Sequence, residues 1–119
     1  MSRRTHRVGD LIRAELSLIL LRRLQDPRVK LASITAVSVS PDLRHAVVQV
    51  SVVGTQEDRD QALLALRHAR GFLRSQLARQ LPKLKMTPEL RFELDRGAEY
   101  SQRISELLEN PDEHGNERP

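Results

Sequence analysis

Residues 60–81 constrain the fold most, because they carry the apolar pattern of a helix and yet contain a glycine. Apolar residues recur at three- and four-residue spacing before Gly71 and again after it. That spacing places them on one face of a helix. A glycine inside a helix costs about 1 kcal/mol relative to alanine, so it requires a structural reason. We therefore predict two helical pieces that meet at a kink formed by Ala69 and Gly71.

The other side of this helical segment is cationic. Arg67, Arg70 and Arg74 are spaced by three and four residues, so on a continuous helix they form one narrow stripe. Such a stripe is often only a solvated helix face. Guanidinium groups also bind phosphate bidentately and stay charged at any relevant pH, so anion binding is the alternative.

The net charge of +4 is unevenly distributed along the 119 residues. It is +5 over residues 1–54, +4 over residues 55–85 and −5 over residues 86–119. A basic body favours a polyanionic partner, with nucleic acid first, although it can also serve solubility alone. The candidate phosphate-binding residues in this accumulation, which become RNA-binding residues if the partner is RNA, are Arg3, Arg4, Arg7, Arg28, Lys30, Arg67, Arg70, Arg74, Lys83 and Lys85.

Aromatic residues are scarce, since the chain contains only Phe72, Phe92 and Tyr100. Proteins that read single-stranded bases by stacking use exposed aromatic rings. Both phenylalanines fall on apolar faces, so we expect them in the core. Nucleic acid would then be bound through phosphates and shape more than through stacked bases.

The N-terminal region is predicted to be an arm followed by a helix. Residues 1–7 are polar and basic and form a loose arm. Residues 8–25 show the apolar pattern of an amphipathic helix, which should end before Pro27 because the preceding residue is disfavoured in a helix. Leu18 and Leu21 broaden the apolar surface of this helix and favour its burial against a sheet over contact with a membrane.

A hairpin and a helix start are predicted next. Residues 33–40 are rich in β-branched side chains, and residues 45–53 alternate between apolar and polar, which is typical of half-buried strands. The proline and aspartate of residues 40–43 suit a turn that joins them as an antiparallel hairpin. Thr55 is a candidate N-cap with Asp58 three positions on, which is an imperfect capping box.

The C-terminal part is predicted to add one strand and one short helix. Residues 89–95 alternate as a strand, and the apolar residues between 100 and 108 suggest the helix. The polar residues 110–119 are expected to be a disordered tail. The fold class is therefore α+β, with helices packed on one face of a three-stranded sheet in a single domain over residues 1–109.

No signal for chemistry or for membrane insertion emerges. The four histidines are scattered without metal-ligand spacing, and no nucleophile, nucleotide-binding or cofactor motif occurs. We expect no enzyme activity, no metal and no cofactor. Cysteine is absent and no apolar run approaches the ~20 residues that cross a bilayer, so we expect a cytoplasmic protein.

An ordered set of short motifs resembles the ribosome-binding factor A family over most of residues 7–95. The matching strings are Arg7-Val8, Leu11-Ile12-Arg13, Glu15-Leu16, Asp26-Pro27-Arg28, Ser40-Pro41-Asp42-Leu43-Arg44, Val50-Ser51-Val52, Ala69-Arg70-Gly71-Phe72-Leu73-Arg74 and Pro88-Glu89-Leu90-Arg91-Phe92. The resemblance implies a type II K-homology fold. It departs from ordinary K-homology domains because Ala69-Arg70-Gly71 stands where they carry a Gly-x-x-Gly loop that clamps the nucleic-acid backbone.

The resemblance also implies a function. Members of the family bind the immature small (30S) ribosomal subunit and 16S ribosomal RNA, near the 5′-terminal helix and the decoding region. They assist late processing of that RNA, support growth in the cold and are released with help from a small-subunit-dependent GTPase. We expect this chain to act likewise, as a monomer. A protein-interaction adaptor and a DNA-binding protein remain the alternatives.

Overall fold

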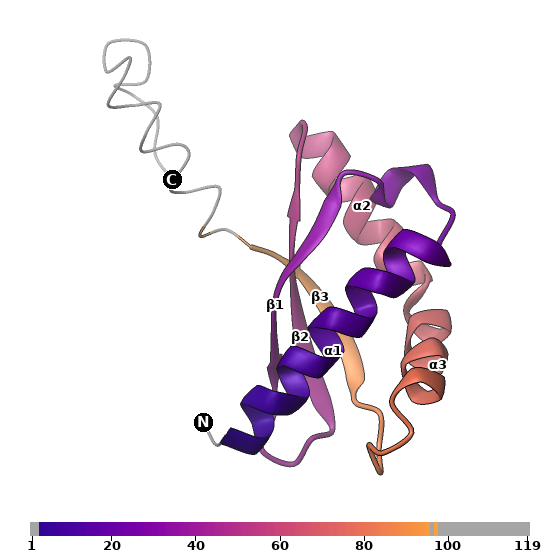
Figure 1. Ribbon diagram of the computed structural model, residues 1–119. Helices are drawn as coiled ribbons and strands as arrows, with labels where there is room; N and C mark the ends of the chain where they lie inside the picture. The colour runs from indigo at the N-terminus through magenta and orange to yellow at the C-terminus, as the bar shows by residue number, and fades with distance from the viewer. Residues whose placement is uncertain (1–2, 96, 98–119) are drawn as a thin grey trace.

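The computed structural model describes residues 3–95 and 97, and these form an α+β fold (Figure 1). The predicted order of helix, strand, strand, broken helix and strand is confirmed. The predicted helix over residues 100–108 and the tail over residues 110–119 lie outside the described residues. The elements are α1 (Arg3–Arg22), the 3₁₀ helix η1 (Pro27–Val29), β1 (Ala32–Val39), β2 (His45–Val52), α2 (Gln56–His68), α3 (Arg70–Gln80) and β3 (Glu89–Leu94).

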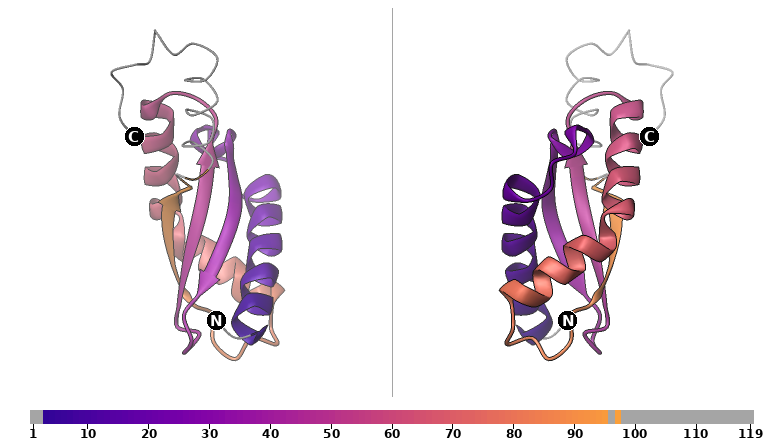
Figure 2. Two further views of the ribbon diagram at one scale, coloured as in Figure 1. Left: turned by 90° about the vertical axis from the view of Figure 1, so that its left-hand side faces the viewer. Right: turned by 90° about the vertical axis from the view of Figure 1, so that its right-hand side faces the viewer.

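The sheet has the order β1-β2-β3. β1 and β2 pair antiparallel, which confirms the predicted hairpin, and β3 runs parallel to β2 with Glu89 opposite His45. A parallel pair needs a crossover connection, which α2 and α3 provide. Every second residue of β2 is buried, because the helices cover one face of the sheet. Figure 2 shows the open face toward the viewer on the left, and α3 crossing in front of the strands on the right.

Helix α1 begins at Arg3, so the predicted loose arm is wrong for residues 3–7. Thr5 is buried, so the buried face of the helix extends into its first turn. The helix also needs Gly9, because a Cβ at that position would lie 2.5 Å from the carbonyl oxygen of Val37 in β1. Glycine therefore lets α1 lie directly on the backbone of β1. The helix ends at Arg22, earlier than predicted.

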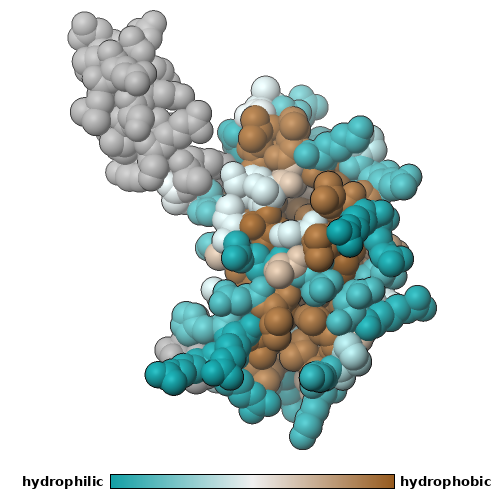
Figure 3. All heavy atoms as spheres, viewed as in Figure 1, coloured by the Kyte–Doolittle hydropathy of each residue, from teal (hydrophilic) through white to brown (hydrophobic). Residues whose placement is uncertain are grey.

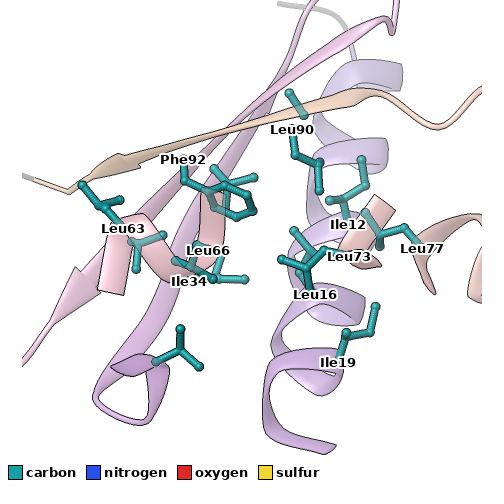
Figure 4. Packing of buried hydrophobic residues seen from close by; sticks show 14 of the residues in the cluster. Ile12, Leu16, Ile19, Ile34, Leu63, Leu66, Leu73, Leu77, Leu90 and Phe92 are labelled. Atoms are coloured by element: carbon teal, nitrogen blue, oxygen red, sulfur yellow. The ribbon is translucent and has the colours of Figure 1, made fainter. Parts of the chain in front are cut away.

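The core lies between the helices and the covered face of the sheet. In Figure 4 the side chains of Ile12 and Leu16 in α1 face those of Leu73 and Leu77 in α3. All four are fully buried, and Phe92 of β3 is buried as predicted. Burial of each such side chain contributes about 1.5–3 kcal/mol, so this contact holds α3 against α1.

Three apolar side chains that the sequence placed in the core are exposed instead. The exposed fractions are 38% for Leu18, 80% for Leu21 and 43% for Phe72. The two leucines lie off the face of α1 that the core occupies, and Phe72 lies off the face of α3 that carries Leu73 and Leu77. Figure 3 shows apolar atoms reaching the surface on the side of the molecule that carries α1 and β1.

The break between α2 and α3 lies at Ala69, where φ is −86° and ψ is 3°. The prediction of two helical pieces is thus confirmed, but the break precedes Gly71 by two residues. Gly71 lies in the first turn of α3, and nothing lies within 4 Å of a Cβ built there. Packing against the described residues therefore does not require a glycine at this position.

A capping box fixes the start of α2. Thr55 Oγ1 accepts a hydrogen bond from the Asp58 N–H at 3.1 Å, and Asp58 Oδ2 accepts one from the Thr55 N–H at 2.8 Å. The predicted cap is confirmed. Gly54 precedes it with a φ of 137°, a conformation that strains any residue with a side chain.

Candidate nucleic-acid interface

Five of the predicted RNA-binding residues lie at the end of the sheet formed by the β1–β2 turn, here called the turn end. α1 starts there, because Gly9 lies on Val37 near the end of β1. The connection from α3 to β3 reaches the same end, because Glu89 at the start of β3 pairs with His45 at the start of β2. Figures 1 and 2 show both segments at this end. The five exposed residues are Arg3, Arg4, Arg7, Lys83 and Lys85.

A surface hollow joins the turn end to α3. Arg70, Arg74 and Lys85 line it, and its volume is about 590 Å³. Three cations face one carboxylate, that of Glu89, so the hollow attracts anions. The other lining residues are Gly71, Ser75, Ala78, Met86 and Thr87. The structure thus brings together three residues that are 4 and 11 positions apart in the sequence.

Arg74 also connects α3 to the segment that precedes β3. Its Nη2 donates to the carbonyl oxygen of Thr87 at 2.8 Å, and its Nε donates to those of Thr87 at 3.1 Å and Pro88 at 3.3 Å. Its Nη1 lies 3.8 Å from Oε1 of Glu89. The half-buried side chain therefore ties α3 to the start of β3. The guanidinium also lines the hollow, so its positive charge contributes to the attraction of anions there.

Arg67 lies apart from Arg70 and Arg74, so the prediction of one continuous stripe is wrong. The helix breaks at Ala69, and the regular turn of about 100° per residue does not continue across the break. Arg67 lines a second hollow together with the acidic Glu93 and Asp95. Its Nη2 donates to the carbonyl oxygen of Phe92 at 3.3 Å. These surroundings suit a structural contact with β3 better than a phosphate.

Arg28 and Lys30 lie at the opposite end of the sheet, just before β1. Arg28 Nη2 lies 2.7 Å from Asp26 Oδ2, and Arg28 Nε lies 3.0 Å from Asp26 Oδ1. Hydrogen bonds from the side chain and the N–H of Arg28 lower the pKa of Asp26 to about 2, and the same side-chain bond raises the pKa of Arg28. The guanidinium charge is therefore neutralised locally, whereas Lys30 at the same end is exposed, as are Arg22 and Arg23 at the end of α1.

Arg44 is an exposed cation of the turn end that was not among the predicted RNA-binding residues. The turn before it is held by Asp42, whose Oδ1 accepts from the Ser40 hydroxyl at 2.6 Å and from the Arg44 N–H at 3.0 Å. These two bonds lower the pKa of Asp42. Leu43 adopts a φ of 62°. The string of residues 40–43, which predicted the turn, was the available signal that Arg44 would lie at its exit.

Two further properties concern other kinds of site. Within residues 3–95 and 97, no cluster of three or more histidine, aspartate or glutamate side chains could hold a metal ion. No helix in this part of the chain is long and apolar enough to span a membrane.

Fold and surface together define a K-homology-like domain. Its sheet carries one antiparallel and one parallel pair, its helices cover one face, and one group of its cations lies at the turn end and in the adjoining hollow. At the junction of α2 and α3, where ordinary K-homology domains have their Gly-x-x-Gly loop, this chain has a direct helix-to-helix break at Ala69.

Comparison with known proteins supplies the family. A family model described as Ribosome-binding factor A matches residues 4–108. Ribosome-binding factor A of Roseiflexus castenholzii is 46% identical over 108 residues, which cover 91% of this chain and 83% of the relative. The chain belongs to the ribosome-binding factor A family.

Solved structures agree with this assignment. The crystal structure of ribosome-binding factor A from Thermus thermophilus matches with a TM-score of 0.68 and 28% identity, covering 77% of this chain and 97% of that one. A homology model of the Thermus thermophilus factor, fitted into a cryo-EM map of a 30S–RbfA complex, matches with a TM-score of 0.62 and 30% identity. That match covers 74% of this chain and 91% of the other. The expected α+β K-homology-like fold is confirmed.

Proposed function

We propose that this chain binds the small ribosomal subunit and assists its assembly. Its family carries the name ribosome-binding factor A, and one structural relative was fitted into a map of a 30S complex. The observation that carries the proposal is the group of exposed cations at the turn end, which continues into the hollow lined by Arg70, Arg74 and Lys85. A surface of this kind binds phosphate groups of RNA through charge.

The finer function follows the family resemblance. The chain binds immature subunits through 16S ribosomal RNA near the 5′-terminal helix and the decoding region. It assists late processing of that RNA, including in the cold, and a small-subunit-dependent GTPase helps to release it. It acts in the cytoplasm, as a monomer and without catalysis of its own. The absence of a Gly-x-x-Gly loop supports binding by side chains more than by backbone amides.

Sedimentation of a cell lysate through a sucrose gradient tests this function. The chain should travel with free small subunits, and cells depleted of it should accumulate unprocessed 16S RNA. Equal amounts on small subunits and on complete ribosomes would contradict the proposal.

Two controls separate the alternatives. Binding that survives ribonuclease treatment and moderate salt would favour a protein-interaction adaptor. Tighter binding to duplex DNA than to structured RNA at the same salt concentration would favour a DNA-binding protein. The proposal predicts the opposite result in both experiments.

A further inference from the structure

Phe72 is the one aromatic side chain among the described residues that is exposed to solvent. Its exposed fraction is 43%, whereas Phe92 is 1% exposed. Phe72 lies in the first turn of α3, and the buried face of that helix is already occupied by Leu73 and Leu77. Packing of the described residues therefore does not explain why a ring is placed there.

The residues next to Phe72 leave room for a nucleic-acid strand. At about 100° per residue, Arg70 and Phe72 lie on either side of Gly71 on the surface of α3. Gly71 is exposed, and nothing lies within 4 Å of the position that a Cβ would occupy there. A strand can therefore cross the outside of α3 at Gly71 with a cation on one flank and an aromatic ring on the other.

The charge of α3 favours such a strand. The helix contains Arg70, Arg74 and Arg79 and no acidic residue. Among the described residues, the Arg70 side chain makes no hydrogen bond or ion pair, so its guanidinium is available to a ligand. A strand that crosses α3 at Gly71 would meet Arg70 on one flank with a phosphate and Phe72 on the other with a base.

We propose that Phe72 stacks on an unpaired nucleobase of the bound RNA while Arg70 contacts the neighbouring phosphate. This inference rests on the proposed function and adds a base-contacting residue to it. Stacking on an aromatic ring tolerates any base, because every base has a π-face. The RNA bound at α3 should therefore contain an unpaired nucleotide but need no particular sequence at that position.

Affinity for purified small subunits tests the inference with three substitutions. Phe72→Leu keeps apolar bulk but removes the ring, and should weaken binding at least about fivefold, which is the lower limit for loss of one stacked base. Phe72→Trp should bind as well as the original chain. Leu64→Ala is the matched control, because Leu64 is also 43% exposed but lies on α2, and it should bind normally. Urea denaturation of each variant checks that it is folded.

A second readout uses the absence of tryptophan from the chain. Phe72→Trp then carries a single tryptophan, whose fluorescence deproteinised 16S ribosomal RNA should quench by stacking, whereas that of Leu64→Trp should be quenched far less. Unchanged affinity of Phe72→Leu, or equal quenching at both positions, would overturn the inference. Full binding by Phe72→Leu with loss by Phe72→Ala would assign Phe72 to an apolar protein contact. If the original chain fails to bind small subunits at low salt, the proposed function fails, and this inference fails with it.

Discussion

The two arginines of the hollow should respond differently to truncation. Among the described residues Arg70 has no hydrogen-bond partner, so Arg70→Ala should change the free energy of unfolding by less than about 0.5 kcal/mol. Arg74 donates three hydrogen bonds to the carbonyl oxygens of Thr87 and Pro88. Hydrogen bonds from charged groups contribute about 1.5–3 kcal/mol, but the Arg74 side chain is 41% exposed and partly screened. We therefore expect Arg74→Ala to lose about 1–2 kcal/mol.

Binding to RNA should separate the two roles further. Each phosphate contact that is lost should reduce the slope of log affinity against log salt by about 0.7–0.9. We expect Arg70→Ala to reduce this slope at unchanged stability, and Arg74→Ala to lower both. Urea denaturation followed by circular dichroism gives the stability, and titration of purified small subunits at several salt concentrations gives the slope. The reasoning is refuted if Arg70→Ala destabilises as much as Arg74→Ala, or if Arg70→Ala leaves the slope unchanged.

Three further substitutions test the scaffold. Gly9→Ala should lower stability by about 1–2 kcal/mol, because overpacking against Val37 exceeds the gain in helix propensity; an unchanged melting temperature would contradict this packing. Gly71→Ala should raise stability by up to about 1 kcal/mol, because the position is open; a lower melting temperature would show that the position is not open. The N–H and hydroxyl of Thr55 lower the pKa of Asp58 in the folded chain. The ionised carboxylate therefore stabilises the fold at pH values above the ordinary pKa of 3.8, and this stabilisation is lost as the pH falls through the lower pKa of the folded state. Asp58→Asn should therefore flatten the acid limb of the stability curve, and an identical limb would count against the cap.

Local sequence signals predicted the parts of the fold that depend on neighbouring residues. The alternation of residues 45–53 gave β2, and the pair Thr55 and Asp58 gave the start of α2, because burial on one face and a cap each involve only a few consecutive positions. The start of α1 was predicted less well. Its first turn contains the buried Thr5, and Gly9 in the next turn lies on Val37, a contact between segments distant in sequence.

The candidate interface was only partly predictable for the same reason. Helical spacing correctly placed Arg70 and Arg74 together, but it assumed a continuous helix and so included Arg67. The contact of Lys85 with the same hollow depends on where the connection to β3 runs. Phe72 was assigned to the core because it falls on an apolar face, whereas in the structure Leu73 and Leu77 occupy the buried face of α3 and Phe72 is exposed.

The salt dependence of binding to purified small subunits tests the central claim most directly. The claim is that exposed cations of the turn end and the hollow contact RNA phosphates, namely Arg3, Arg4, Arg7, Arg44, Arg70, Lys83 and Lys85. If these contacts form, affinity should fall on the order of a thousandfold between about 50 and about 200 mM monovalent salt. A fall of less than about threefold over that range would mean that phosphate contacts do not carry the binding.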